Sequence, residues 1–116
     1  GIDGKAPRIL WANKVLFEFN GYAPEEVIGQ SPKMFQGPLT DRKTLDKIRH
    51  ALENWQPIRA EILNYKKDGT TYWNELEIVP IANDQGWFTH WVSVQRIVTD
   101  RKLLEAENHK LAFYDR

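Results

Sequence analysis

The sequence predicts a single α+β domain in which helices pack against one face of an antiparallel sheet. The chain has 116 residues, which is enough for one hydrophobic core. Its first half carries apolar residues at helical spacing, whereas the half from Pro57 onward alternates apolar and polar residues. Two turn sequences, Lys67-Asp68-Gly69 and Asn83-Asp84-Gln85-Gly86, divide the alternating half into three strands.

Short elements are expected before the first long helix. In order, they are a strand over 8–13, a helix over 14–20 that stops at Asn20-Gly21, a helical turn over 24–28 and a loop over 29–37. The turn begins with Pro24 and two glutamates, and both residue types suit the start of a helix. The loop has no helix or strand periodicity, so it is either a simple turn or one wall of a ligand pocket.

The remaining elements are longer and better defined. A helix is predicted from Asp41 to about Asn54 with Thr40 as its N-cap, and Leu45, Ile48 and Trp55 lie on its buried stripe. Three strands over 58–65, 71–80 and 87–98 follow, and then a helix from Asp100 to about Tyr114. We assign 1–99 to the domain and 100–116 to its C-terminal helix.

Composition excludes several classes of function. The 16 basic and 16 acidic residues give no net charge, which argues against a nucleic-acid or anionic-membrane surface. The absence of cysteine excludes disulfides and thiolate chemistry. No apolar run is long enough to span a bilayer and no signal peptide opens the chain, so we expect a cytoplasmic protein without membrane contact.

No catalytic or metal-binding motif is present in the sequence. His50, His90 and His109 do not have metal-ligand spacing, and there is no nucleophile elbow, P-loop or glycine-rich dinucleotide motif. We therefore predict no catalytic residue, no metal site and no enzymatic activity for this chain.

Three primary amides are predicted on one face of the sheet. Strand alternation places Asn64 with Ile62, Asn74 with Leu76, and Gln95 with Ser93. Each amide alone could be satisfied by a backbone partner, but three that converge suggest a ligand. An amide donates and accepts hydrogen bonds, so the set suits a heterocycle edge of alternating C=O and N–H groups, as in a flavin.

A flavin phosphate would also need cations. Lys33 in the loop and Arg49 on the long helix are the candidates, with solvated surface charge as the alternative explanation. Gln36 and Ser31 are further candidates from the same loop, unless they are only turn residues.

The sequence resembles PAS sensor domains over nearly its whole length. The resemblance rests on N-x7-GY-x-PEEVIG from Asn13 to Gly29, and on the later stretches NYKKDGTTYWNELEIVPI and HWVSVQR. Within that family it is most similar to flavin-binding LOV domains, whose loop typically reads G-x-N-C-R-F-L-Q-G. This motif aligns without gaps with Gly29–Gly37.

The resemblance implies an FMN or FAD site. It implies phosphate contacts from Lys33 and Arg49, and ring contacts from Gln36, Asn64, Asn74 and Gln95, with Ser31 in place of the family asparagine. At Pro32, light-sensing LOV domains carry the cysteine that bonds to the excited flavin. Proline has no nucleophile, so covalent photochemistry is excluded and a non-covalent flavin remains.

The same resemblance implies a five-stranded sheet and an output domain. The first and central strand would lie upstream of Asp3-Gly4, so it is missing or truncated here. Leu111–Arg116 resembles the segment that leads from a PAS domain into a GGDEF diguanylate cyclase, which implies a bacterial cyclic-di-GMP signalling protein with a GGDEF/EAL-type output domain. Ile97-Val98-Thr99 replaces the usual Asp-Ile-Thr, so the polar latch between the last strand and the helix is in doubt.

The outer sheet face is predicted to be apolar and to form a homodimer together with the C-terminal helix. Its residues are Leu63, Tyr65, Trp73, Val79, Val92 and Val94. The alternative is that the helix folds back over its own sheet. Two alternative functions also remain open: a ligand-free PAS dimerisation module, and a haem-binding PAS sensor with His50 as axial ligand.

Overall fold

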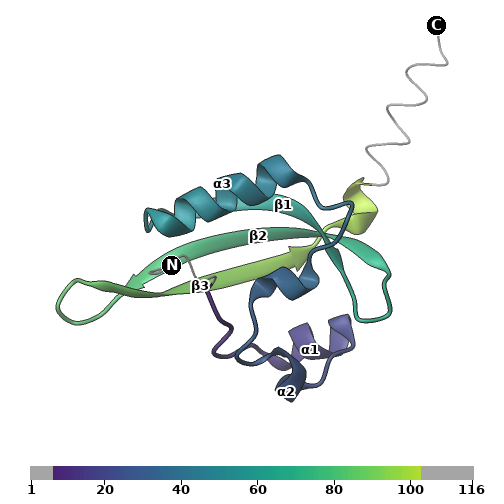
Figure 1. Ribbon diagram of the computed structural model, residues 1–116, viewed down its shortest axis with the longest axis horizontal. Coiled ribbons are helices and arrows are strands. Elements are labelled where there is room, and N and C mark those ends of the chain that lie inside the picture. The colour runs from purple at the N-terminus through teal and green to yellow at the C-terminus, as the bar shows by residue number, and fades with distance from the viewer. Residues whose placement is uncertain (1–6, 103–116) are drawn as a thin grey trace, which may run out of the picture.

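The computed structural model describes residues 7–102, which form an antiparallel sheet with helices on one face. The helices are α1 (Lys14–Asn20), α2 (Pro24–Val27), the 3-10 helix η2 (Pro32–Phe35) and α3 (Arg42–Glu53), and the strands are β1 (Ile58–Tyr65), β2 (Thr71–Ala82) and β3 (Phe88–Ile97). The strand order is β1-β2-β3, and both pairs are antiparallel. Figure 1 shows α3 along β1, with α1 and α2 together on the side away from α3. The predicted α+β class is confirmed.

The predicted strand over 8–13 is wrong. The Ile9 amide donates to the Gln30 carbonyl at 2.9 Å and the Gly29 amide donates to the Ile9 carbonyl at 2.7 Å, but no ladder continues from them. Asn13, expected at the end of the strand, instead caps α1 by accepting a hydrogen bond from the Leu16 amide at 3.3 Å. This segment therefore lies beside the 29–30 turn and does not join the sheet.

The loop over 29–37 contains one helical turn that its sequence pattern did not predict. Pro32 opens η2, where its fixed φ and missing N–H are tolerated, and the Ser31 hydroxyl accepts from the Lys33 amide at 3.2 Å. Phe35 at the end of this turn is buried in the core with Val27 and Ala51. The turn therefore anchors the loop against the inner face of the sheet.

The N-cap of α3 is Asp41, which corrects the prediction of Thr40. The Asp41 carboxylate accepts from the Thr44 amide at 3.0 Å. Thr40 is buried and used elsewhere: its hydroxyl donates to the Leu63 carbonyl of β1 at 2.7 Å and accepts from the Gly37 amide at 3.1 Å. The Thr40 hydroxyl therefore bonds to β1, and it does not cap α3.

The loop that ends at Thr40 covers the C-terminal end of β1 at Leu63 and Tyr65. The Tyr65 ring lies directly over Gly37, and the Tyr65 hydroxyl accepts a hydrogen bond from the Leu39 amide at 2.9 Å. By contrast, no strand pairs with the outer edge of β3 within residues 7–102. The described part of the sheet therefore has three of the five strands that the resemblance implies, with one edge partly covered and the other unpaired.

Strand register fixes which side chains share the inner face. β1 and β2 pair Ile62 with Asn74, and β2 and β3 pair Leu76 with Gln95. Because side chains alternate between faces, the face that carries these residues also carries the buried Tyr72. β2 continues two residues beyond the predicted end, and β3 is one residue shorter at each end than predicted.

The C-terminal helix begins earlier than predicted. Residues 99–102 are helical, and the Lys102 amide donates to the Val98 carbonyl at 3.1 Å. The rest of the predicted helix, including Leu111–Arg116, lies outside the described residues.

Candidate functional site

The three predicted amides meet on the inner face of the sheet. The Asn74 amide nitrogen donates to Asn64 Oδ1 at 3.0 Å and to Gln95 Oε1 at 2.9 Å. Asn64 Nδ2 donates to the Phe35 carbonyl at 3.2 Å, and Gln95 Nε2 donates to the Ser93 hydroxyl at 3.3 Å. These hydrogen bonds form a continuous row, which we call the amide row, from η2 across all three strands.

Burial differs along the amide row. Asn74 is 2% exposed and Asn64 is 5% exposed, whereas Gln95 on the edge strand is exposed. Buried amides need partners, and here the side chains satisfy one another. The row therefore has a closed end at Asn64 and an open end at Gln95, where a further group can bond.

Sequence reasoning missed a second buried polar pair beside this row. Asn20, expected only to stop a helix, accepts a hydrogen bond from the Tyr72 hydroxyl at 2.7 Å and donates to the Leu16 carbonyl at 2.9 Å. Burial raises the pKa of the Tyr72 phenol, while the hydrogen bond to Asn20 acts in the opposite direction. This pair joins α1 to β2, and nothing local in the sequence indicates it.

The loop candidates do not reach the amide row through any described hydrogen bond. Ser31 caps η2 with its hydroxyl, Lys33 is exposed, and Gln36 is half-buried at the end of η2. η2 nevertheless contacts the row, because the Phe35 carbonyl accepts from Asn64.

Arg49 lies on the solvent side of α3. Its side chain is 64% exposed, and its guanidinium pairs with Asp46 at 3.4 Å and Glu53 at 3.9 Å. Exposed pairs of this kind are weak, so they hold the side chain only loosely. Neither candidate cation is therefore placed next to the amides.

The donor set of the amide row fits the edge of a flavin ring. Amide oxygens and nitrogens alternate along the row, as C=O and N–H alternate along a pyrimidine edge. The fit is poorer for the phosphate, since Lys33 and Arg49 both face solvent. The geometry thus matches the ring end of such a cofactor better than its phosphate end.

A polar latch joins β2 to the start of the C-terminal helix, although the usual aspartate is missing. The Trp73 amide donates to the Thr99 hydroxyl at 2.9 Å, and the Val98 amide donates to the Trp73 carbonyl at 2.9 Å. Lys102 Nζ lies 5.2 Å from the centre of the Trp73 ring. Threonine and lysine therefore hold this junction.

Two glutamates on the outer face strengthen the latch. Glu61 pairs with Lys102 at 2.6 Å and also with Arg101. Glu75 pairs with Arg96 at 2.7 Å, Arg59 at 3.1 Å and Arg101 at 3.7 Å. The hydrogen bond from Arg59 lowers the pKa of Glu75 below its ordinary value, and that from Lys102 lowers the pKa of Glu61.

Acidification should weaken this latch. A carboxylate whose pKa is lower in the folded chain stabilises the fold above its unfolded pKa, about 4.3 for glutamate, and loses that contribution as pH falls further. We expect the urea midpoint of the Glu75→Gln variant to fall less steeply below this pH than that of the parent chain. Glu18→Gln, which removes only an exposed helical pair with Lys14, is the control. Identical pH profiles for Glu75→Gln and the parent would contradict the prediction.

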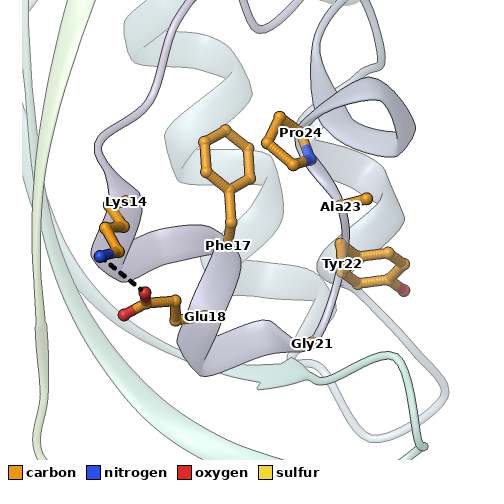
Figure 2. Close-up of a pocket in the computed structure, with 7 residues that line it drawn as sticks. All are labelled: Lys14, Phe17, Glu18, Gly21, Tyr22, Ala23 and Pro24. Atoms are coloured by element: carbon orange, nitrogen blue, oxygen red, sulfur yellow. Dashed lines mark ion pairs between the residues drawn. The ribbon is translucent and has the colours of Figure 1, made fainter.

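A surface hollow of about 620 Å³ lies next to α1 and α2 (Figure 2). It is lined by Lys14, Phe17, Glu18, Gly21, Tyr22, Ala23 and Pro24, and the Lys14–Glu18 ion pair of 3.4 Å lies at its side. None of the predicted site residues lines it. The hollow is open to solvent, and its ion pair is exposed, so it lacks the convergent buried polar groups of a ligand site.

Residues 7–102 contain no group of three or more His, Asp or Glu side chains that could hold a metal ion. No helix within the same range is long and apolar enough to cross a membrane.

Comparison with known proteins identifies the fold. A family model described as PAS domain matches residues 2–100. The chain therefore belongs to the PAS domain family.

Within this family, the similarity is to light-oxygen-voltage (LOV) domains. The structure superposes on the light state of the blue-light photoreceptor Aureochrome1 LOV with a TM-score of 0.80 and 30% identity, covering 93% of this chain and 86% of that one. A LOV domain studied with a flavin analogue gives a TM-score of 0.78 and 33% identity, covering 89% of this chain and 78% of that one.

The curated relatives are larger signalling proteins. The blue-light-activated histidine kinase of Brucella anthropi is 40% identical over 104 residues, which is 88% of this chain and 21% of the kinase. Phototropin-2 of Oryza sativa subsp. japonica is 37% identical over 87 residues, which is 75% of this chain and 10% of phototropin-2. The chain thus spans about a fifth or less of the length of these relatives.

Proposed function

We propose that this chain is a sensory PAS domain that binds FMN or FAD non-covalently and reports the state of the flavin to an attached output domain. The observation that carries the proposal is the amide row, whose polar atoms match a flavin ring edge. The LOV structures that superpose on the chain, one of them studied with a flavin analogue, support the same cofactor.

Residues in the loop and on α3 complete the proposed site. Asn64, Asn74 and Gln95 orient the ring, and Gln36 and Ser31 border it from the η2 side. Lys33 and Arg49 bind the phosphate. Both cations are exposed, and the ion pairs that Arg49 must leave are weak surface pairs, so the rearrangement costs little.

Pro32 replaces the cysteine of light-sensing LOV domains, so a bound flavin can signal here only without a covalent bond to the protein. A flavin absorbs blue light and exchanges electrons, and the protein orients it and tunes its surroundings. The chain has no cysteine, so no thiol can attack the ring. The sensed state in this proposal is therefore occupancy, redox state or electron transfer without a covalent adduct.

The proposed output follows the C-terminal helix. We assign a cyclic-di-GMP domain of the GGDEF/EAL type, because Leu111–Arg116 resembles the segment that precedes such domains, and this assignment implies a bacterial, cytoplasmic protein. Several relatives are histidine kinases, so a kinase is the competing assignment. Sequencing or expressing the region that follows residue 116 distinguishes the two.

Dimer formation is proposed through the outer sheet face and the C-terminal helix. Val79, Val92 and Val94 are exposed there, Val94 to 65%, whereas Trp73 is half-buried beneath Lys102. An exposed apolar cluster of this kind favours association with a second copy.

The visible absorption spectrum of the purified chain tests the cofactor. We expect the oxidised flavin bands, and release of FMN or FAD on heat denaturation identified by chromatography. A haem Soret band would overturn the proposal; His50, the candidate axial ligand, is exposed on α3. A colourless protein that fails to take up either flavin would favour the ligand-free dimerisation module, which is consistent with amides that already satisfy one another.

A further inference from the structure

Two tryptophans stack at the end of α3, on the inner face of the sheet. The rings of Trp55 and Trp91 are nearly parallel, with centroids 4.1 Å apart and planes inclined by 5°. Phe88 lies 5.9 Å from Trp55 at an inclination of 15°. Trp55 follows α3, while Trp91 belongs to β3, so the stack connects the helix layer to the edge strand.

Trp55 occupies a position that normally selects glycine. Among the described non-glycine residues it alone has a positive φ, 53°. The Trp55 amide donates to the Leu52 carbonyl at 3.2 Å, and the Gln56 amide donates to the Ala51 carbonyl at 2.9 Å. These two bonds form a Schellman motif at the end of α3, in which glycine is favoured at the position of Trp55. A bulky residue in this conformation is strained, so packing alone would be better served by glycine here.

Trp91 carries a second unfavourable feature. Its indole Nε1 is buried and has no hydrogen-bond partner within the described residues. Buried donors normally find a partner, so an orphan of this kind needs an explanation. Strain at Trp55 and an orphan donor at Trp91 thus coincide in one stacked pair.

The pair lies in line with the amide row. Trp91, Ser93 and Gln95 alternate along β3 and share the inner face. Four residues of strand separate Trp91 from Gln95 by about 13 Å at Cα, and the indole is large enough to shorten that gap. Trp91 and Gln95, the residue proposed to contact the flavin ring, therefore lie on the same face of one strand.

The other tryptophans within residues 7–102 have no stacked partner to share a positive charge. Trp11 and Trp87 are 78% and 69% exposed. Trp73 lies on the outer face under the Lys102 ammonium, 5.2 Å from the ring centre, and a cation there opposes loss of an electron. In the stack, two rings can share one positive charge.

Tyr72 shares the inner face but lacks a base. Oxidation of a phenol requires loss of its proton, and the Tyr72 hydroxyl donates at 2.7 Å to Asn20 Oδ1, an amide oxygen that cannot take the proton. An indole can give up an electron without losing a proton, which suits the orphan Nε1 of Trp91.

We infer that the Trp55–Trp91 stack is the internal one-electron donor to a light-excited flavin, an inference that rests on the proposed function. Trp91 would give up one electron from its π system, a bound and light-excited flavin would be the acceptor, and no bond would form or break. The Nε1 proton stays on Trp91 because no described acceptor contacts it. The positive charge is shared with Trp55 until the electron returns in the dark, so no external reductant is consumed.

The test uses the flavin-loaded 116-residue chain and four variants. Trp91→Phe removes the donor, Trp55→Phe removes its stacking partner, and Trp87→Phe and Tyr72→Phe are matched controls. Transient absorption after a blue flash should show an indole radical cation in the parent and both controls, none in Trp91→Phe, and a shorter-lived one in Trp55→Phe. Flavin fluorescence should rise in Trp91→Phe because the quenching step is lost.

Two results would overturn the donor assignment while leaving the proposed function intact. One is an unchanged radical signal in Trp91→Phe, and the other is loss of the signal in Tyr72→Phe alone. Failure of the parent chain to bind flavin would remove both proposals together. Near-ultraviolet circular dichroism of the flavin-free chain provides an independent check, since both stack variants should lose the signal of paired indoles and Trp87→Phe should retain it.

Discussion

A Gly37→Ala substitution is expected to destabilise the fold by about 1–3 kcal/mol, the usual range for overpacking. The added Cβ would lie 2.4 Å from Tyr65 Cε1 and 2.6 Å from Cζ. The ring cannot simply swing away, because its hydroxyl accepts the Leu39 amide hydrogen bond. Urea denaturation of the purified variant, with the free energy of unfolding extrapolated to water, measures the effect.

A double-variant cycle separates this clash from other effects. In a Tyr65→Ala background the space above position 37 is open, so the same Gly37→Ala change should add almost no further cost. An equal cost in both backgrounds would show that the ring contact is not the cause.

Asn74→Leu is expected to have the largest effect on the proposed flavin site. Leucine cannot donate, so the buried Asn64 oxygen loses its described donor, at a cost of about 1–3 kcal/mol. Gln95 is exposed and can turn to water, so its loss matters less for stability. In the Asn74→Leu/Gln95→Leu variant we expect loss of bound flavin, measured as the ratio of flavin to protein absorbance after gel filtration.

The control for this experiment is Gln56→Leu, which removes an exposed amide with a single long hydrogen bond of 3.4 Å. It should change neither stability nor flavin retention. If the double variant keeps as much flavin as the parent and as Gln56→Leu, the assignment of the amide row to the ring is wrong.

The inner face of the sheet could be predicted because strand periodicity is local. Two-residue alternation is enough to place Asn64, Asn74 and Gln95 on one face, and turn residues at 67–69 and 83–86 set the strand order. Their shared face was therefore predictable from the sequence, whereas the hydrogen bonds between them depend on the register of the strands.

The parts that could not be predicted depend on partners far along the chain. Asn20 and Tyr72 are 52 residues apart, and Thr40 and the Leu63 carbonyl are 23 apart. Local rules assigned Asn20 to a helix end and Thr40 to a helix cap, both reasonable uses of those side chains. In the structure, Asn20 also accepts a hydrogen bond from Tyr72. Thr40 donates to the Leu63 carbonyl and does not cap the helix.

The predicted strand over 8–13 failed for a related reason. A strand is defined by its neighbour, and apolar residues in a short segment do not identify one. Leu10 and Trp11 are both exposed, and the segment pairs only with the 29–30 turn.

The two edges of the sheet differ in how open they are to pairing with a further strand. At the end of β1, the Thr40 hydroxyl occupies the Leu63 carbonyl and the Leu39 amide bonds to the Tyr65 hydroxyl, so a further strand cannot pair at this part of the edge. β3 contains no lysine or proline, the residues that often prevent a further strand from pairing with a sheet edge. Within residues 7–102, no strand pairs with its outer backbone groups. The edge at β3 is therefore more open to a further strand than the part of β1 that holds Leu63 and Tyr65. A polypeptide that pairs with β3, from the same molecule or another, would place its backbone beside Gln95 and the open end of the amide row.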